Sequence, residues 1–598
     1  MTARRAAVAC ALLLPRVAWA ADPMLARRGV PAAAIVIAPT AKPDEKLAAG
    51  ELQEYVRKIS GATLPIALSD RRTSVIPSVR IGVFGQAPVE AWKGEKPAPD
   101  AFSVETSGNE LYVVGGDTRG ALYGTYELIE RALDVRWFMP GELGEDVPAQ
   151  STLPLPRVKF AKGPAFGHVS GIIWGGGPGT EAWELRMRGK VGPPEAFGHN
   201  WHNVLPFTPQ NFAANPEWFA EVGGVRGQSP QLCTAHPDIV RFSVEAARRY
   251  FDRNPDSPLF SLSPNDGYGF CEDARCRAVD ALYGGGAGVL SDRFVHYGNE
   301  VLAQLATTHP GKQVGIYAYA THVNPPNRAR PAPGYATMVA KMPWEFCHVH
   351  ALADPACGPN RRFLSYMQGW NSVVAHSGIY EYYGHFFVSA TWPIVHSLRR
   401  DIPLYHQMGI ERFITESQQH WATQGLNLYV TAKLLWDPKA DVDLLLDEYY
   451  KRFYGKAATA MRRYWGRWEE AMLATATHGD GGYEWLRVFT NPLVAETGGY
   501  LVEAERAAAD DSEKVRRRVA FVKVGHGYTE AWTQIIEAGL RGDVAGARAW
   551  GDEAIRRGRA TAGMVPQPVY VYIVETQTPY LVYLASLGVP PWVSLRYP

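Results

Sequence analysis

Three carboxylates in the middle of the sequence directly follow short apolar runs, at the points where strands are expected to end. They are Asp266, Glu381 and Glu416. In a parallel barrel all strands end at one rim, so side chains that follow different strands can meet there. Hydrolysis of a glycosidic bond requires a carboxylic acid and a carboxylate that acts as base or nucleophile. The pattern therefore predicts these three residues as catalytic.

Each carboxylate also has a structural interpretation. Asp266 precedes a glycine and could simply form a turn. Glu416 could pair with Arg412 on the preceding strand. Glu381 lies among aromatic residues, where an ionised carboxylate is costly unless it is paired, and this environment favours a functional role.

Polar and aromatic residues near the same strand ends could bind a sugar. Aromatic residues make up 12% of the chain, with 18 Trp and 29 Tyr, and their rings can stack on sugar faces as well as fill a core. The predicted substrate-binding residues are His199, Asn200, His202, Asn265, His322, Tyr382, Tyr383 and Trp421. The same residues would serve a barrel that binds carbohydrate without cleaving it.

The histidines offer a different chemistry. The spacings His199-x-x-His202 and His348-x-His350 could belong to a metal-dependent hydrolase. Neither matches the HExxH pattern, so hydrogen-bonding or solvated histidines are the favoured interpretation. We expect neither a metal site nor a cofactor.

Five cysteines remain once Cys10 is removed with a predicted export signal. In an oxidising compartment Cys271 could pair with Cys276, and Cys347 with Cys357, which would leave Cys233 unpaired. A zinc site is the alternative, but the spacings contain no CxxC pair. We predict a Cys271–Cys276 disulfide that fixes the loop after Asp266.

Residues 1–20 resemble an export signal. Arg4 and Arg5 precede an apolar run at 6–14, and Ala18-Trp19-Ala20 is a small-x-small cleavage site. We therefore expect export to the periplasm or the outside. No later stretch of about 18 apolar residues follows, so no integral membrane segment is expected.

Composition limits the partners and the fold class. Lys+Arg number 61 and Asp+Glu 60, a net charge of +1 that argues against nucleic acid as a partner. The length of 598 residues suggests about three or four domains, or one barrel with additions. Carbohydrate is the expected partner, and the sequence leaves the oligomeric state open.

The order of predicted elements indicates three regions after the signal. Residues 30–150 mix strands with two amphipathic helices, as in a small α/β sandwich domain. Residues 165–436 alternate apolar runs with helical patterns, over a length that suits a (β/α)8 barrel. Residues 440–598 are predicted to be helical. The expected fold class is α/β, with the barrel between the two other domains.

Several motifs resemble known families. Residues 51–61 and 120–138 resemble the N-terminal domain of α-glucuronidases and of family 20-type hexosaminidases. The central part is similar to the DUF4838 family. That similarity rests on residues 263–267 followed by Cys271 and Cys276, on 380–382, and on 433–438 with 454–455.

The resemblance implies a glycoside-hydrolase-like barrel that follows a non-catalytic α/β domain in the sequence. In the α-glucuronidases an acid and a pair of basic carboxylates come from separate barrel strands. Glu381 and Glu416 look like the pair, and Asp266 or a nearby acid would donate the proton. Glu381 stands where the DUF4838 family usually has aspartate, and Tyr380 where it has tryptophan. The resemblance thus implies an exported glycoside hydrolase, with uronic sugars as one substrate class.

Overall fold

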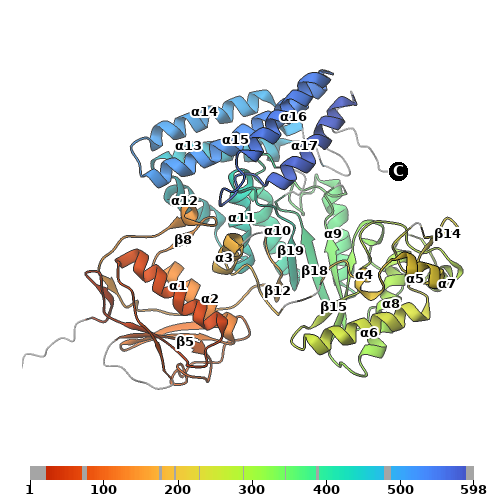
Figure 1. Ribbon diagram of the computed structural model, residues 1–598, viewed down its shortest axis with the longest axis horizontal. Coiled ribbons are helices and arrows are strands. Elements are labelled where there is room, and N and C mark those ends of the chain that lie inside the picture. Colours follow the sequence, from red (N-terminus) through yellow and green to blue (C-terminus); the bar gives the residue numbers. More distant parts are fainter. Residues whose placement is uncertain are drawn as a thin grey trace, which may run out of the picture. The chain divides into compact units, whose positions relative to one another are not determined.

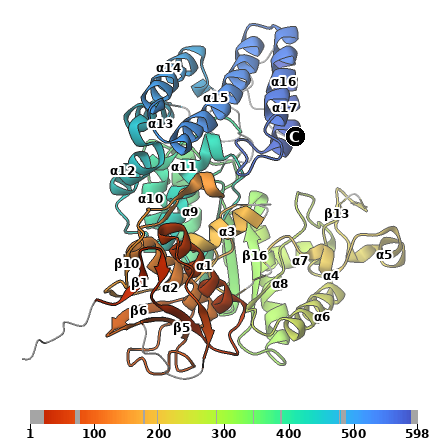
Figure 2. The same ribbon diagram turned by 60° about the vertical axis from the view of Figure 1, so that its left-hand side comes forward.

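The computed structural model describes most of the chain. The described residues are 22–69, 77–173, 178–193, 195, 197–227, 229–286, 288–343, 345–384, 389–476, 478 and 487–587. The predicted export signal lies outside them. They form two compact units (Figures 1 and 2). The first comprises the described residues up to 134 together with 147–162, and the second comprises 135–146 and the residues from 163 onward.

The first unit is a mixed sheet covered by two helices. Its strand order is β11-β6-β7-β5-β3-β4, with β3, β4, β5 and β7 parallel and β6 and β11 antiparallel to their neighbours. The strands are β3 (Ala34–Ile37), β4 (Ile66–Leu68), β5 (Ser78–Val83), β6 (Phe102–Ser107), β7 (Glu110–Gly115) and β11 (Lys159–Lys162). A second small sheet has the order β10-β1-β2, from β1 (Met24–Arg27), β2 (Val30–Pro31) and β10 (Leu153–Pro154).

Local signals explain both helices of this unit. α1 (Pro43–Ser60) begins with a proline and ends at Gly61, whose φ of 80° suits a residue without Cβ. α2 (Thr118–Ala132) is capped by Asp117, whose side chain accepts a hydrogen bond from the backbone N–H of Gly120. The two helices pack against each other, so they cover the same side of the sheet (Figure 1).

The second unit contains a curled parallel sheet with the order β12-β19-β18-β17-β16-β15. Every adjacent pair is parallel. Its strands are β12 (His168–Val169), β15 (Leu259–Ser261), β16 (Gln313–Ala318), β17 (Tyr335–Ala340), β18 (His376–Glu381) and β19 (Arg412–Thr415). The sheet is a half-barrel rather than the closed (β/α)8 barrel predicted, because β12 and β15 remain edge strands in the described part of the chain.

One predicted strand explains much of that difference. The apolar run at 199–205 contributes only a parallel bridge from His199 to Ser263, and the chain then turns into the short helix α4 (Trp201–Val204). Helices between and after the strands cover the sheet. They include α6 (Pro237–Arg253), α8 (Val289–Leu305), α9 (Gly358–Asn371), α10 (Val395–Gln407) and α11 (Trp421–Trp436). Shorter elements are α3 (Pro178–Arg186), α5 (Pro209–Ala214), α7 (Ala274–Leu282), and the hairpins β8 (Arg136–Trp137)/β9 (Glu145–Asp146) and β13 (Glu221–Val222)/β14 (Val225–Arg226).

The end of the chain is helical. The helices are α12 (Val442–Tyr454), α13 (Ala458–Ala474), α14 (Asn491–Ala508), α15 (Glu513–Leu540), α16 (Val544–Arg559) and α17 (Val571–Ser586). From α13 onward each packs against the next, and α15 also packs against α11 at the sheet (Figure 1). Buried tryptophans such as Trp465, Trp468 and Trp532 fill this layer. Among the described helices, none combines the length and apolarity needed to cross a bilayer.

Candidate active site

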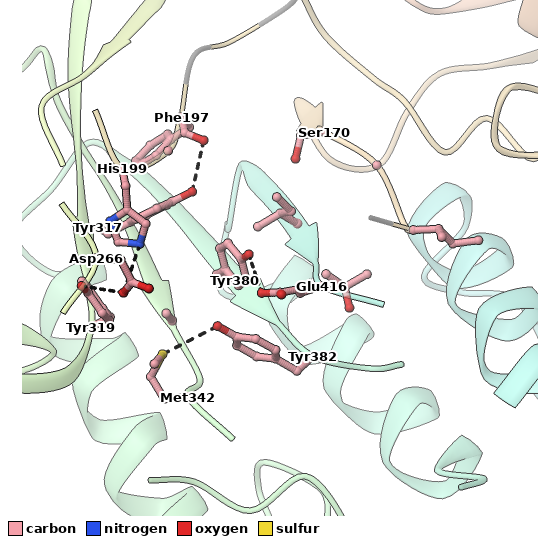
Figure 3. A pocket seen from close by; sticks show the side chains of 16 residues that line it. Ser170, Phe197, His199, Asp266, Tyr317, Tyr319, Met342, Tyr380, Tyr382 and Glu416 are labelled. Carbon is pink, nitrogen blue, oxygen red and sulfur yellow. Dashed lines mark hydrogen bonds and ion pairs between the residues drawn. The ribbon is translucent and has the colours of Figure 1, made fainter. Parts of the chain in front are cut away.

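A cavity of about 710 Å³ lies at the carboxyl ends of the parallel strands (Figure 3). Strands β16, β17 and β18 and the residues just after them contribute alternate residues to it, as the period of two in a strand requires, whereas the end of β19 contributes three consecutive residues. These are Tyr317 and Tyr319 from β16, Ala340 and Met342 from β17, Tyr380 and Tyr382 from β18, and Ile414, Thr415 and Glu416 from β19. Asp266 and His199 complete the polar lining together with Ser170.

Glu416 is half-buried in this cavity at the end of β19. Its Oε2 accepts a hydrogen bond of 2.8 Å from the Tyr380 hydroxyl. Burial raises the pKa of Glu416 to about 7, and the charge of Asp266 adds to the rise, while the Tyr380 bond opposes it. A carboxyl group with this pKa can hold a proton near neutral pH and donate it to a leaving group.

Asp266 occupies the loop after β15, with 79% of its side chain exposed. Its Oδ1 accepts a hydrogen bond of 3.2 Å from the Tyr319 hydroxyl and lies 3.6 Å from His199 Nε2. The other nitrogen of His199 donates to the carbonyl of Pro264 at 2.6 Å, which leaves Nε2 directed toward Asp266. Figure 3 shows Asp266, His199 and Tyr319 on one side of the cavity and Tyr380 with Glu416 on the other.

Four tyrosines form much of the wall between these two carboxylates. Burial raises the pKa of Tyr317, Tyr319, Tyr380 and Tyr382, so their hydroxyls stay protonated and can donate hydrogen bonds. Tyr317 also stacks on Phe197, with ring centroids 5.1 Å apart. This wall offers apolar ring faces and neutral hydroxyls to a ligand.

The structure corrects the prediction for Glu381. Its neighbours Tyr380 and Tyr382 face the cavity, so Glu381 points to the opposite side of the sheet and is fully buried. There Tyr405 donates a hydrogen bond of 2.5 Å to its Oε1, and Lys341 Nζ lies 3.6 Å from the same oxygen. Glu381 belongs to a buried ion network and does not line the cavity.

That network contains a second carboxylate. Asp401 on α10 lies 4.0 Å from Lys341 Nζ, and its Oδ1 accepts a hydrogen bond from the backbone N–H of Leu352. Burial raises the pKa of Asp401 to about 7, and the nearby Glu381 adds to this rise while Lys341 opposes it. One lysine thus faces two buried carboxyl groups, a pairing that makes burial of these charges tolerable.

Six of the predicted substrate-binding residues have other positions. Asn200 is buried and donates to the carbonyl of Ser261, whereas the side chain of His202 is exposed outside the cavity lining. Asn265 stabilises its loop through two hydrogen bonds. Its Oδ1 accepts one from the backbone N–H of His202, and its Nδ2 donates one to the carbonyl of Pro230. These residues shape the loop that carries Asp266.

His322, Tyr383 and Trp421 are buried away from the cavity. His322 packs against Phe270 and Phe294, and burial lowers its pKa to about 3. Tyr383 is almost fully buried and does not line the cavity. Trp421 is also buried, as the first residue of α11. Of the predicted binding residues, only His199 and Tyr382 line the cavity.

Tyr317, Tyr319 and Phe197 line the cavity but are not among the residues predicted from the sequence, and Tyr380 is notable in the sequence only as part of a motif. The signal for the tyrosines was available, because each lies an even number of residues from another cavity residue on its own strand. Phe197 follows no strand pattern, and only the folded chain reveals that it stacks on Tyr317.

Cys271 and Cys276, which are predicted to form a disulfide, are both free thiols in the structure, and their sulfur atoms lie within 4.8 Å of each other. The Sγ of Cys276 also lies 3.7 Å from that of Cys233, and Cys271 accepts a hydrogen bond from the backbone N–H of Glu221. All three cysteines are buried in one small cluster. The loop after Asp266 is therefore attached to the β13–β14 hairpin by packing, and not closed on itself.

The half-barrel with its cavity at the carboxyl ends of the strands is similar in fold to a solved glycoside hydrolase. A family GH115 4-O-methyl-α-glucuronidase with specificity for decorated arabinogalactans matches with a TM-score of 0.60 and 13% identity, over 96% of this chain and 81% of that one. A GH138 enzyme targeting pectin rhamnogalacturonan II matches with a TM-score of 0.47 and 10% identity, over 93% and 99%.

The sequence itself identifies the family. The chain belongs to the family described as Domain of unknown function (DUF4838), which matches residues 139–466. A comparison with curated proteins finds no match. The match begins within the segment 135–146, which belongs to the second unit, and ends inside α13. It therefore includes the whole parallel sheet and the cavity.

Proposed function

We propose that this protein is a glycoside hydrolase in which Glu416 is the proton donor and Asp266 the base or nucleophile. The observation that carries the proposal is that one cavity contains both Asp266, which is exposed, and Glu416, which is half-buried and whose pKa burial raises to about 7. Two carboxyl groups in different environments are what an acid and a base on one sugar require. The fold shared with the GH115 α-glucuronidase supports the reaction class.

In this mechanism the Glu416 proton goes to the glycosidic oxygen as the bond from that oxygen to the anomeric carbon breaks. Asp266 either takes a proton from an attacking water or attacks the anomeric carbon itself. The Tyr319 hydroxyl holds Asp266 in position by a hydrogen bond, and His199 with both ring nitrogens protonated adds an ion pair at 3.6 Å. The tyrosine wall supplies ring faces for stacking and hydroxyls for hydrogen bonds to the sugar.

The substrate class proposed is an oligosaccharide or polysaccharide. Among the described lining residues, His199 is the only side chain that can carry a positive charge. A uronic acid would therefore have to place its carboxylate near His199, whereas a neutral sugar needs no cation. A panel that contains both kinds of glycan separates these two substrates.

The test is digestion of such a panel by the wild type and by Glu416→Gln and Asp266→Asn, with mass-spectrometric detection of released sugars. Each substitution should reduce turnover by about 10²–10⁴-fold. Glu411→Gln is the matched control, because Glu411 immediately precedes the same strand, with 44% of its side chain exposed. Wild-type turnover in both cavity variants would reject the mechanism. Binding without any sugar release would instead indicate a silent carbohydrate-binding protein.

We also propose that the protein is exported, on the basis of the N-terminal charge, apolar run and cleavage pattern. Expression in a bacterial host with an active export system, followed by N-terminal sequencing, should give a mature chain that begins at Ala21. A chain that keeps residues 1–20 and stays in the cytoplasm would contradict this.

A further inference from the structure

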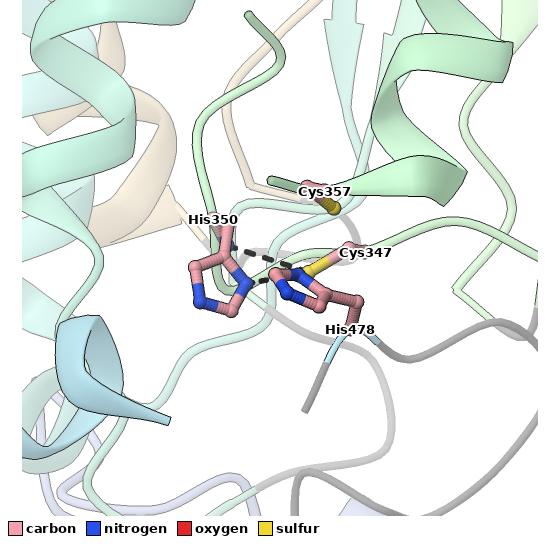
Figure 4. Close-up of side chains that lie close together, drawn as sticks. All are labelled: Cys347, His350, Cys357 and His478. Carbon is pink, nitrogen blue, oxygen red and sulfur yellow. Dashed lines mark hydrogen bonds between the residues drawn. The ribbon is translucent and has the colours of Figure 1, made fainter. Parts of the chain in front are cut away.

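Four metal-binding side chains converge at a place separate from the cavity. They are Cys347, His350, Cys357 and His478, and one ligand atom of each lies within 4.8 Å of the others (Figure 4). The first three follow β17, whereas His478 comes after α13, more than a hundred residues later in the sequence. None of the four lines the cavity that contains Glu416.

We propose that these four residues bind a structural zinc ion. Two thiolates and two imidazoles are a common tetrahedral donor set for zinc, and the soft sulfur ligands disfavour magnesium and calcium. Three of the four residues are almost fully buried, with Cys357 0%, Cys347 1% and His350 4% exposed. A closed site with four protein ligands leaves no position for a substrate, which makes the ion structural.

His350 is already oriented as a ligand. Its Nε2 donates a hydrogen bond of 2.9 Å to the carbonyl of Thr475, which leaves the Nδ1 lone pair for a metal. That Nδ1 lies 3.3 Å from Cys347 Sγ, and the same sulfur accepts a hydrogen bond from the backbone N–H of His350. Backbone donation to sulfur favours the thiolate form that zinc binds.

His478 provides an independent observation. Its Nδ1 is buried and has no hydrogen-bond partner in the described part of the protein. Its ring lies against that of His350, with centroids 4.4 Å apart. Leaving a polar nitrogen buried and unpaired is unfavourable, and a metal ion coordinated by this atom removes the cost.

The second thiol cluster differs in the fourth donor. Beside Cys233, Cys271 and Cys276 it has Asp273, whose Oδ2 is paired with Arg226 at 2.9 Å. The Oδ1 of Asp273 accepts the backbone N–H of Cys276 at the start of α7. Both carboxylate oxygens thus already have partners, so the proposal concerns the Cys347 cluster alone.

The ion would connect two distant segments. The loop that carries three ligands begins at Lys341, which contacts Glu381, and includes His348, 3.8 Å from Glu381 Oε2. Coordination by His478 would hold this loop to the segment after α13. Zinc binding displaces the protons of the two thiols and stabilises the folded form by its binding free energy.

The experiment uses the full chain with Cys233→Ser and Cys276→Ser, so that the other thiol cluster contributes no metal. Purified without chelator, this protein should contain about one zinc ion per chain by elemental analysis. Adding Cys357→Ser, or separately His478→Ala, should remove that ion. Equal zinc content with and without these changes would overturn the proposal, as would metal-free protein that fails to take up added zinc.

A second measurement applies to the wild type and does not depend on folding of the variants. X-ray absorption at the zinc edge should show sulfur ligands at about 2.3 Å and nitrogen ligands at about 2.0–2.1 Å. Cobalt substituted for zinc should give the visible bands of a tetrahedral site and a thiolate charge-transfer band. Peptide mapping of freshly alkylated protein that finds Cys347 joined to Cys357 by a disulfide would overturn the proposal.

Discussion

Tyr380 lies on β18 and Glu416 directly follows the neighbouring strand β19, and the tyrosine hydroxyl donates a 2.8 Å hydrogen bond to the glutamate in the cavity wall. The bond stabilises the charged form of Glu416, in opposition to burial, which raises its pKa to about 7. The two residues therefore set together the pH at which Glu416 loses its proton. This relationship also holds the carboxyl group in place for proton transfer.

Replacement of Tyr380 by phenylalanine should shift the pH profile of the enzyme. If Glu416 is the proton donor, kcat/KM falls as the pH rises through its pKa, about 7. Loss of the hydrogen bond raises that pKa, so the alkaline limb should move to higher pH in Tyr380→Phe. Steady-state rates from about pH 5 to about pH 9 measure the limb. An unchanged limb, or one at lower pH, would contradict the assignment of Glu416.

Replacement of His199 and replacement of His202, which are three residues apart in the sequence, should affect activity differently. His199 lines the cavity beside Asp266, whereas His202 is exposed outside the cavity lining. His199→Ala should lower kcat/KM by about 10-fold or more, since Asp266 loses a positioning partner. His202→Ala, the matched control, should keep wild-type rates. Equal losses in both variants would show that the loop, and not the His199 ring, determines activity.

The buried Lys341 should be important for stability. Lys341→Met leaves Glu381 and Asp401 without their shared cation, which should lower the free energy of unfolding by about 3–5 kcal/mol. Burial raises the pKa of Asp401 to about 7, so this carboxyl group is neutral at about pH 5 and charged at about pH 8, and the loss should be larger at the higher pH. Urea denaturation at both pH values measures it.

A double variant provides the control for this prediction. Glu381→Gln added to Lys341→Met removes one of the two uncompensated carboxylates and should recover part of the lost stability. A double variant less stable than Lys341→Met alone would show that Glu381 is held mainly by Tyr405 and not by the lysine.

Arg518 on α15 should be required to hold the segment 135–146 against helices α12 and α15. Its guanidinium donates to the carbonyls of Leu143, Glu145, Arg452 and Phe453, and only 1% of the residue is exposed. Arg518→Met leaves these acceptors buried and should cost about 3 kcal/mol or more of unfolding free energy. The exposed neighbour Arg517 is the control, and Arg517→Met should change stability by less than about 0.5 kcal/mol. Similar losses in both variants would contradict the role of Arg518.

Local sequence patterns predicted several parts of the fold well. Gly61 at the end of α1 and Asp117 at the start of α2 act within one turn of backbone, so their effect is visible in the sequence, whereas α1 begins at Pro43 and not after a cap at Asp44. The position of Asp266 and Glu416 after apolar runs also places them at strand ends, because parallel strands end at a common edge.

The sequence could not decide which face of each strand borders the cavity. Glu381 and Glu416 both follow apolar runs, yet the alternation of side chains sends Glu381 to the α10 side while Tyr380 and Tyr382 face the cavity. A shift of one residue reverses every side chain, and that register depends on pairing with the neighbouring strands.

By itself, then, the sequence determined the elements with local signals and the residue types that could act at strand ends. Tertiary structure decided which of them meet. Cys347 and His478 are close only because α13 returns the chain to the loop after β17. Cys271 contacts Cys233 and the β13–β14 hairpin for a similar reason. Proximity between distant segments is set by packing of whole elements, whose free energy is spread over many side chains that no short motif contains.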